Sequence, residues 1–299
     1  MEDLIVKPFR ENDKPMKPIM KGLVSPSWVG MFVGSRGSGK SLSSIRWVNF
    51  FQKPKNKKRG KKIKPYFDHV YLINPSYYQD KKNEHMGIDE ENIFLNPSND
   101  VIQVLDDEMK SNIEEWEEEE DYKKLYEKFM KHGEECLDNM EVIKLMKENF
   151  REPEKKHSSV PPTHLLICDD CASSDLMKQG KSYFNHFVML SRHRNCSVII
   201  NVQYFKAPAV PKIIRDNLTF LCIFKTHDNK SLNEIWEEVS GVLPRKEFLK
   251  LYDYATKQKH NFLYINLRDD DEKRFRKNFN EPITPEKLGE VNDEDYVVE

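Results

Sequence analysis

The sequence has no apolar run that approaches the ~20 residues needed for a membrane-spanning helix. Its first fifteen residues contain no apolar segment of the kind found in a secretory signal. Cysteine is scarce: the 299 residues include five, an odd number at irregular spacings, which predicts a reducing compartment. Cys168 and Cys171 form a C-x-x-C pair, but no second pair with zinc-type spacing exists, so no metal or redox role is expected. These absences predict a protein without membrane anchor or disulfides.

Charge is abundant but unevenly distributed along the chain. Lys and Arg number 48 and Asp and Glu 50, which gives a formal net charge of -2 at pH 7. Residues 53–64 carry eight basic residues and no acid, 114–121 carry seven acids and no base, and 286–299 are mostly acidic. The basic block could contact DNA phosphates or be a solvated loop. The acidic block at 114–121 is interpreted as the solvent-exposed face of a helix. The alternative is that it contacts the basic loop of a neighbouring subunit.

Residues 32–44, FVGSRGSGKSLSS, contain the G-x-x-x-x-G-K-[ST] pattern of a phosphate-binding loop. A short apolar run, 28–34, precedes the loop, and apolar residues at helical spacing follow it in 41–52. Backbone N–H groups in this strand–loop–helix context can surround the β-phosphate of a nucleotide. Lys40 is expected to reach the β and γ oxygens, and Ser41 to hold Mg²⁺. The predicted nucleotide-binding residues are Gly34, Ser35, Arg36, Gly37, Ser38, Gly39, Lys40 and Ser41.

Residues 164–170, HLLICDD, form an apolar strand that ends in two acids. A magnesium site needs a carboxylate on a neighbouring strand, and Asp169 is predicted to bind Mg²⁺, directly or through water. Asp170 is predicted to be the general base that polarises an attacking water, which favours hydrolysis over phosphorylation of a small molecule. The N-K-x-D motif of GTPases fails at Leu232 and the L-S-G-G-Q signature of ABC ATPases is absent, so neither of these two classes is expected.

Strand patterns alternate with helical patterns, which predicts an α/β fold with a mostly parallel sheet. The expected strands lie at 28–34, 69–76, 91–98, 164–170, 196–203, 218–226 and 261–268. From 101 to about 150 the pattern is helical and is interpreted as an inserted hairpin or short helices. The expected organisation is an irregular N-terminal arm (1–27), a P-loop ATPase domain (28–285) with its helical insertion at about 100–155, and an acidic C-terminal tail (286–299).

Residues 192–203, RHRNCSVIINVQ, combine an arginine, a short turn, a strand and a glutamine. Together with the phosphate loop and the paired acids, this segment resembles the FtsK–HerA superfamily of ring-shaped DNA-pumping ATPases. The resemblance implies a RecA-like P-loop fold, in which Arg192 completes the neighbouring subunit's site and Gln203 senses the γ-phosphate. Arg194, and Arg215 in a segment that also fits the family pattern, are alternative candidates for the trans-acting arginine.

Within that superfamily, the short chain, the paired acids and the SRHR segment resemble the poxvirus-type DNA-packaging ATPases of large eukaryotic DNA viruses and virophages. The resemblance covers roughly 28–52 and 160–226. It implies a motor that hydrolyses ATP with Mg²⁺ and translocates double-stranded DNA into a viral capsid. Its expected partners are its own copies, in a ring of about five or six subunits, and a capsid or portal-type component. Its expected location is the viral assembly site in the host cytoplasm, or the virion.

Three alternatives stay open. A cellular or plasmid FtsK–HerA translocase or helicase would have the same motifs and no capsid. A phage-assembly or secretion ATPase would act on protein instead of DNA. A nucleotide-binding structural subunit would have no need of Lys40, Asp169 and Asp170 together, and the presence of all three favours an enzyme.

Overall fold

The computed structural model describes eleven stretches of the chain, namely 23–52, 65–79, 81–153, 160–172, 174–180, 182–206, 209–226, 228–239, 241, 243–268 and 274–288. The basic block 53–64, most of the expected N-terminal arm and most of the acidic tail lie outside the described residues. Within the described stretches, no helix is both long and apolar enough to cross a membrane.

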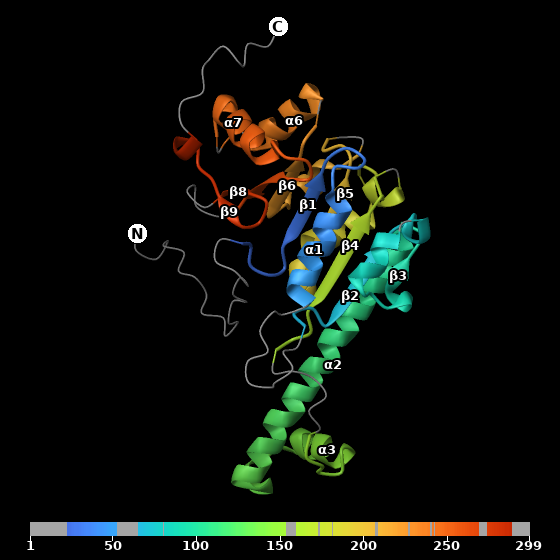
Figure 1. Ribbon diagram of the computed structural model, residues 1–299. Helices are drawn as coiled ribbons and strands as arrows, with labels where there is room; N and C mark the ends of the chain where they lie inside the picture. Colours follow the sequence, from blue (N-terminus) through green and yellow to red (C-terminus); the bar gives the residue numbers. More distant parts are fainter. Residues whose placement is uncertain are drawn as a thin grey trace.

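Across the described residues, nine strands form one sheet in the order β3-β2-β4-β5-β1-β6-β7-β8-β9 (Figure 1). Their bounds are β1 Val29–Val33, β2 His69–Ile73, β3 Ile93–Phe94, β4 His164–Asp169, β5 Cys196–Val202, β6 Phe220–Phe224, β7 Phe262–Asn266, β8 Phe275–Lys277 and β9 Glu281–Pro282. The strands from β3 to β6 in this order pair in parallel, and β7, β8 and β9 pair antiparallel. The predicted α/β fold with a mostly parallel sheet is therefore confirmed.

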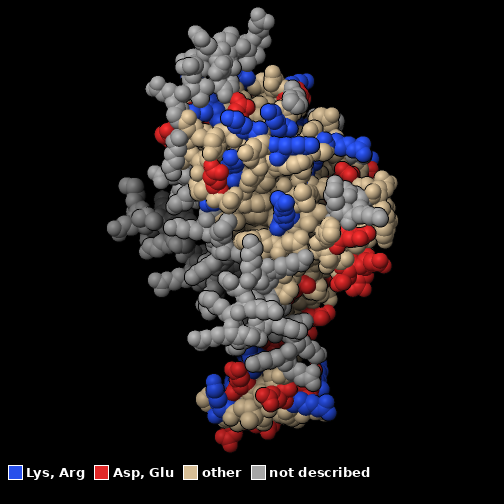
Figure 2. All heavy atoms as spheres, viewed as in Figure 1, with Lys and Arg blue, Asp and Glu red and all other residues tan. Residues whose placement is uncertain are grey.

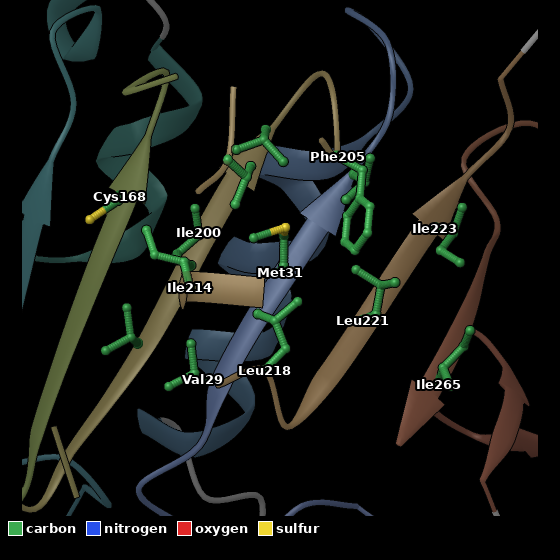
Figure 3. Close-up of a cluster of buried hydrophobic side chains, with 14 of the residues drawn as sticks. Val29, Met31, Cys168, Ile200, Phe205, Ile214, Leu218, Leu221, Ile223 and Ile265 are labelled. Carbon is green, nitrogen blue, oxygen red and sulfur yellow. The ribbon is translucent and has the colours of Figure 1, made fainter. Parts of the chain in front are cut away.

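Helices cover both faces of the sheet, which explains why its central strands are apolar throughout. The helices are α1 Lys40–Gln52, α2 Asn99–His132, α3 Asn139–Lys147, α4 Tyr183–Leu190, α5 Lys212–Asp216, α6 Asn229–Val239 and α7 Arg245–Thr256. Side chains alternate along β1: Phe32 packs in the core under α1, whereas Met31 packs in the core under α4, α5 and α7. Figure 3 shows Met31 in this second core, near Ile200 and Ile214.

The inserted segment is a helical hairpin whose first helix, α2, runs unbroken for 34 residues. Ser98 caps its start by accepting a hydrogen bond from the Val101 N–H, and Gly133 lies at its C-cap. The first half packs on the sheet, while the second half projects away from it with α3 at its far end (Figure 1). This projecting part is called the arm below. The Lys128 Nζ lies 2.7 Å from a Glu141 carboxylate oxygen and joins α2 to α3.

The acidic block 114–121 lies on the arm. Four of its glutamates are exposed, as expected for the wet face of a helix: Glu114, Glu115, Glu117 and Glu118. Figure 2 shows acidic and basic side chains side by side at the far end of the arm, so charge of both signs is mixed there.

One local prediction was wrong, and one helix was not predicted. The strand expected at 91–98 is reduced to Ile93–Phe94, because it lies at the sheet edge and pairs only with β2. Residues 245–256 form α7, which the sequence analysis does not predict; its buried Phe248, Leu251 and Tyr252 pack against the sheet.

Candidate nucleotide-binding site

The site lies at the carboxyl ends of β1, β5 and β4. The sequence analysis placed the acid-bearing strand beside the phosphate-loop strand, and this is wrong: β5 pairs with both, so it separates β1 from β4. Adjacent strands lie about 4.8 Å apart, so the carboxyl ends of β1 and β4 are separated by about 10 Å. This gap leaves room for phosphates and a cation between them.

The phosphate loop needs its glycines for two physical reasons. A Cβ on Gly34 would lie 2.7 Å from the Cβ of Phe224 on β6, so no side chain fits there. Gly37 and Gly39 have φ angles of +78° and +107°, which other residues rarely adopt. Within the described residues, the backbone N–H groups of Arg36, Gly37 and Gly39 have no hydrogen-bond acceptor. Together with the start of α1, these groups form a cradle for an anion.

Lys40 is held inside the loop. Its Nζ donates to the carbonyl oxygens of Gly34, at 2.6 Å, and Ser35, at 3.0 Å, and the residue is 9% exposed. Burial lowers the pKa of Lys40, while the carboxylates of Asp169 and Asp170 partly offset this effect. The ammonium group is therefore held at the phosphate loop, and its contact with the β and γ phosphates stays a prediction.

Asp169, at the end of β4, is buried, and the side chains of Ser41 and Asn201 lie beside its carboxylate. Burial, and then the Asp170 carboxylate, raise the pKa of Asp169 to about 6, against the opposing effect of Ser41 and Asn201. The structure therefore brings Ser41 and Asp169 together, as the sequence predicts. An oxygen donor set of a hydroxyl and one carboxylate, completed by phosphate and water, suits Mg²⁺.

Asn201, on β5, is a site residue that the sequence analysis missed. It is buried, its Nδ2 donates to the Ser44 Oγ at 3.1 Å, and its Oδ1 has no hydrogen-bond partner among the described residues. A buried carbonyl oxygen without a partner is costly unless a bound group satisfies it. This orphan oxygen beside Asp169 is consistent with a hydrated cation at the site. The only sequence signal was an amide near the end of a mostly apolar strand.

Asp170 follows Asp169 in the sequence, but its side chain lies in a different environment. It has a left-handed φ of +55° and is exposed to the cleft. The Ser76 hydroxyl, just after β2, lies 2.9 Å from Asp170 Oδ2 and donates to it. One acid is thus buried beside Ser41, and the other faces solvent beside Ser76. This division fits the predicted roles of cation ligand and general base.

The loop, Asp170 and Gln203 line one open cleft of about 1720 Å³. Gln203 directly follows β5 and is exposed. The Gly34 N–H donates to the carbonyl of Val202 at 3.2 Å, so the end of β5 is tied to the start of the phosphate loop. Gln203 therefore lies beside the start of the phosphate loop. Its sensing role stays a prediction.

The three candidate arginines have different environments, and none of them lines this cleft. Arg192 lies in the short turn before β5, is exposed, and has no side-chain partner among the described residues. Arg194 pairs with the buried Asp106 on α2. Arg215 pairs with Glu238 and lies over the Phe205 ring, 5.6 Å from its centroid. Arg194 and Arg215 therefore have structural partners, whereas Arg192 is free to contact another molecule.

Asp106, in the first half of α2, links this helix to the turn that carries Arg192. Its carboxylate lies 2.6 Å from Arg194 Nε and 2.8 Å from Lys110 Nζ, and it accepts a hydrogen bond from Tyr183 at 2.7 Å. Burial raises the pKa of Asp106, but the hydrogen bonds from Lys110, Arg194 and Tyr183 outweigh it, so the pKa stays below its ordinary value.

Asp106→Ala is expected to lower the free energy of unfolding by about 3–5 kcal/mol, because it leaves the largely buried Arg194 without its partner. Urea denaturation measures this loss. Asp107→Ala, at an exposed position next to it, is the matched control and should change stability by about 0.5 kcal/mol or less. The double variant Asp106→Leu with Arg194→Met should recover most of the loss. Equal effects of Asp106→Ala and Asp107→Ala would contradict this prediction.

Cys168 and Cys171 are both buried in the core. The hydrogen bond with Cys171, and then burial, raise the pKa of the Cys168 thiol. Among the described residues, no group of three or more His, Cys, Asp or Glu side chains could hold a metal ion. Both side chains pack in the core that contains Tyr71 and Ile200.

Known proteins match parts of this chain. A family model described as "Poxvirus A32 protein" matches residues 128–270, a range that begins after the phosphate loop. The "Uncharacterized protein 075L" of Invertebrate iridescent virus 6 is 28% identical over 111 residues, which are 37% of this chain and 42% of that protein. The match thus spans less than half the length of this curated relative.

Two solved structures give further similarities. One is the genome packaging NTPase B204 from Sulfolobus turreted icosahedral virus 2 with AMP, at a TM-score of 0.46 and 13% identity over 85% of this chain and 97% of that chain. Another is the pCW3 conjugation coupling protein TcpA with ATPγS, at a TM-score of 0.42 and 17% identity over 93% of this chain and 72% of that chain. The part of the chain that holds β4, the arginine turn and β5 resembles the poxvirus A32 proteins, which confirms the predicted resemblance to the poxvirus type.

Proposed function

We propose that this protein is a Mg²⁺-dependent ATPase that packages a viral genome by translocating double-stranded DNA into the capsid. The observation that carries the proposal is the grouping of Lys40, Asp169, Asp170 and Gln203 at one edge of the sheet. The match to the poxvirus A32 family supports the viral assignment. Copies of the chain would act as a ring with a capsid or portal component, at the assembly site in the host cytoplasm.

Each group of residues has a separate role in the proposed hydrolysis of ATP. The loop N–H groups and Lys40 bind the phosphates and stabilise the charge that develops on the transferred phosphoryl group. Ser41 and Asp169 hold Mg²⁺, which supplies further charge neutralisation. Asp170, oriented by the Ser76 hydroxyl, accepts the proton of the attacking water. Gln203 contacts the γ-phosphate. When hydrolysis removes this phosphate, the contact is lost and the change is transmitted along β5.

ATP hydrolysis measured with and without duplex DNA tests this proposal. DNA is expected to increase turnover, and a chelator of divalent cations is expected to abolish it. Lys40→Ala is expected to reduce turnover by about 10²-fold or more, since the phosphates lose their cationic partner. Arg46→Ala, on the exposed face of the same helix, is the matched control and should retain activity. Hydrolysis that duplex DNA does not change would contradict the DNA motor and favour a substrate of another class.

A further inference from the structure

His260 contacts the phosphate loop from a distant part of the chain, the turn between α7 and β7. Its Nδ1 lies 3.1 Å from the carbonyl oxygen of Ser38. A carbonyl oxygen only accepts, so Nδ1 carries the hydrogen and donates it. A Cβ on Gly39 would lie 3.1 Å from this Nδ1, so the ring packs directly against the loop. His260 also lines the same cleft as Lys40.

The backbone around His260 is held in an uncommon conformation. His260 has a φ of +68°, in the left-handed region that non-glycine residues rarely adopt. The backbone and the side chain of the neighbouring Asn261 are both hydrogen-bonded. Its N–H donates to the Gln258 carbonyl oxygen, and its Oδ1 accepts a hydrogen bond from the Asn278 side chain at 3.2 Å. Asn278 also accepts from the Phe262 N–H. Strained residues that their surroundings hold in place are concentrated at functional sites.

The hydrogen bond fixes the orientation of one peptide unit in the loop. The peptide between Ser38 and Gly39 is planar and trans, so its C=O and its N–H point in opposite directions. With the Ser38 carbonyl held toward His260, the Gly39 N–H points away from the ring. This N–H has no acceptor among the described residues. The flanking peptides are hydrogen-bonded, through Ser38 N–H to Ser35 and through Gly39 C=O to Ser43, but among the described residues the peptide between Ser38 and Gly39 is held only by the ring, and Gly39 tolerates the backbone angles of a rotated peptide.

We propose that His260 is a positioning residue for the phosphate site: it holds the Ser38–Gly39 peptide so that the Gly39 N–H faces the bound phosphate. A rotated peptide would instead place the Ser38 carbonyl oxygen in the anion site, where it repels phosphate. The inference rests on the proposed nucleotide-binding function of the loop. It gives the C-terminal antiparallel part of the sheet a direct role in that function.

Three variants separate the ring from the backbone strain. His260→Gly removes the ring and accepts the left-handed φ without strain. His260→Asn keeps an N–H donor near the position of Nδ1, and Asn is among the residues enriched at positive φ. Lys259→Ala, at the exposed neighbouring position, is the matched control.

Calorimetric affinities for ADP and for inorganic pyrophosphate test the inference. His260→Gly is expected to weaken the affinities for ADP and for pyrophosphate by the same factor. This factor is about fivefold to tenfold, as expected for the loss of one hydrogen bond. His260→Asn should recover most of the affinity, and Lys259→Ala should match wild type. Unchanged pyrophosphate affinity in His260→Gly would overturn the inference, and a loss for ADP alone would assign the ring to the base or ribose instead. If the wild-type protein binds neither compound, the proposed nucleotide-binding function fails as well.

Discussion

Arg192→Ala is expected to leave ATP binding nearly unchanged and to abolish DNA-stimulated hydrolysis. Arg192 precedes β5, whereas Gln203 and the cleft lie at the other end of that strand. A strand rises about 3.3 Å per residue, so the two ends of β5 are about 20 Å apart. This is farther than an arginine side chain reaches. Arg192 therefore lies too far away to contact the phosphates of its own subunit, and we propose that it acts on those of a neighbouring subunit.

The expected loss is large because such an arginine stabilises charge that builds up on the phosphoryl oxygens. In other NTPases this contribution is about 10³–10⁵ in rate. Steady-state ATPase assays with duplex DNA measure the loss, and nucleotide-binding assays check that affinity is retained. Loss of ATP affinity together with activity would instead indicate a defect in the protein's own site.

Mixing Arg192→Ala protein with Asp170→Asn protein tests the action in trans. A mixed ring contains some interfaces at which a subunit with Asp170 meets a subunit with Arg192. Those interfaces are complete, so the mixture is expected to regain part of the activity that neither variant has alone. No recovery on mixing would mean that Arg192 acts within its own subunit or that the copies do not assemble.

Arg194 and Arg215 provide the comparison for this experiment. Because Arg194 pairs with buried Asp106 and Arg215 pairs with Glu238, their replacement should lower stability before it changes the chemical step. Full activity of Arg192→Ala, with loss of activity in a stably folded Arg194→Ala or Arg215→Ala protein, would move the trans-acting role to one of these residues.

Asp170→Asn is expected to keep ATP bound and to reduce hydrolysis by about 10²–10⁴-fold, the usual contribution of a general base. Asparagine has the same shape and can still accept a hydrogen bond from Ser76, so the local geometry is kept while the base is lost. Asp169 keeps its contact with Ser41, so the cation site is retained.

Single-turnover hydrolysis, measured beside ATP affinity, separates these two effects. Asp175→Asn, at an exposed carboxylate shortly after the same strand, is the matched control and should behave as wild type. Turnover of Asp170→Asn at the wild-type rate would show that another group activates the water.

The sequence by itself determined the features that depend on neighbouring residues. The phosphate loop is one of them, because Gly37 and Gly39 have backbone angles that only glycine adopts readily. The buried strand that ends in Asp169 and Asp170 is another, since an apolar run followed by acids is visible in the chain. The alternation of strands and helices likewise indicated the parallel sheet.

The tertiary structure alone decided which distant residues meet. Strand order is one example: β5 lies between β1 and β4 because of pairing between strands far apart in the chain. Asn201 contacts Ser44 across 157 positions, and His260 contacts Ser38 across 222. No local sequence pattern predicts these contacts, because each depends on how the whole sheet is assembled. The sequence therefore predicts the groups that we propose to bind phosphate, and the assembled sheet brings distant residues such as Asn201 and His260 into contact with their segments.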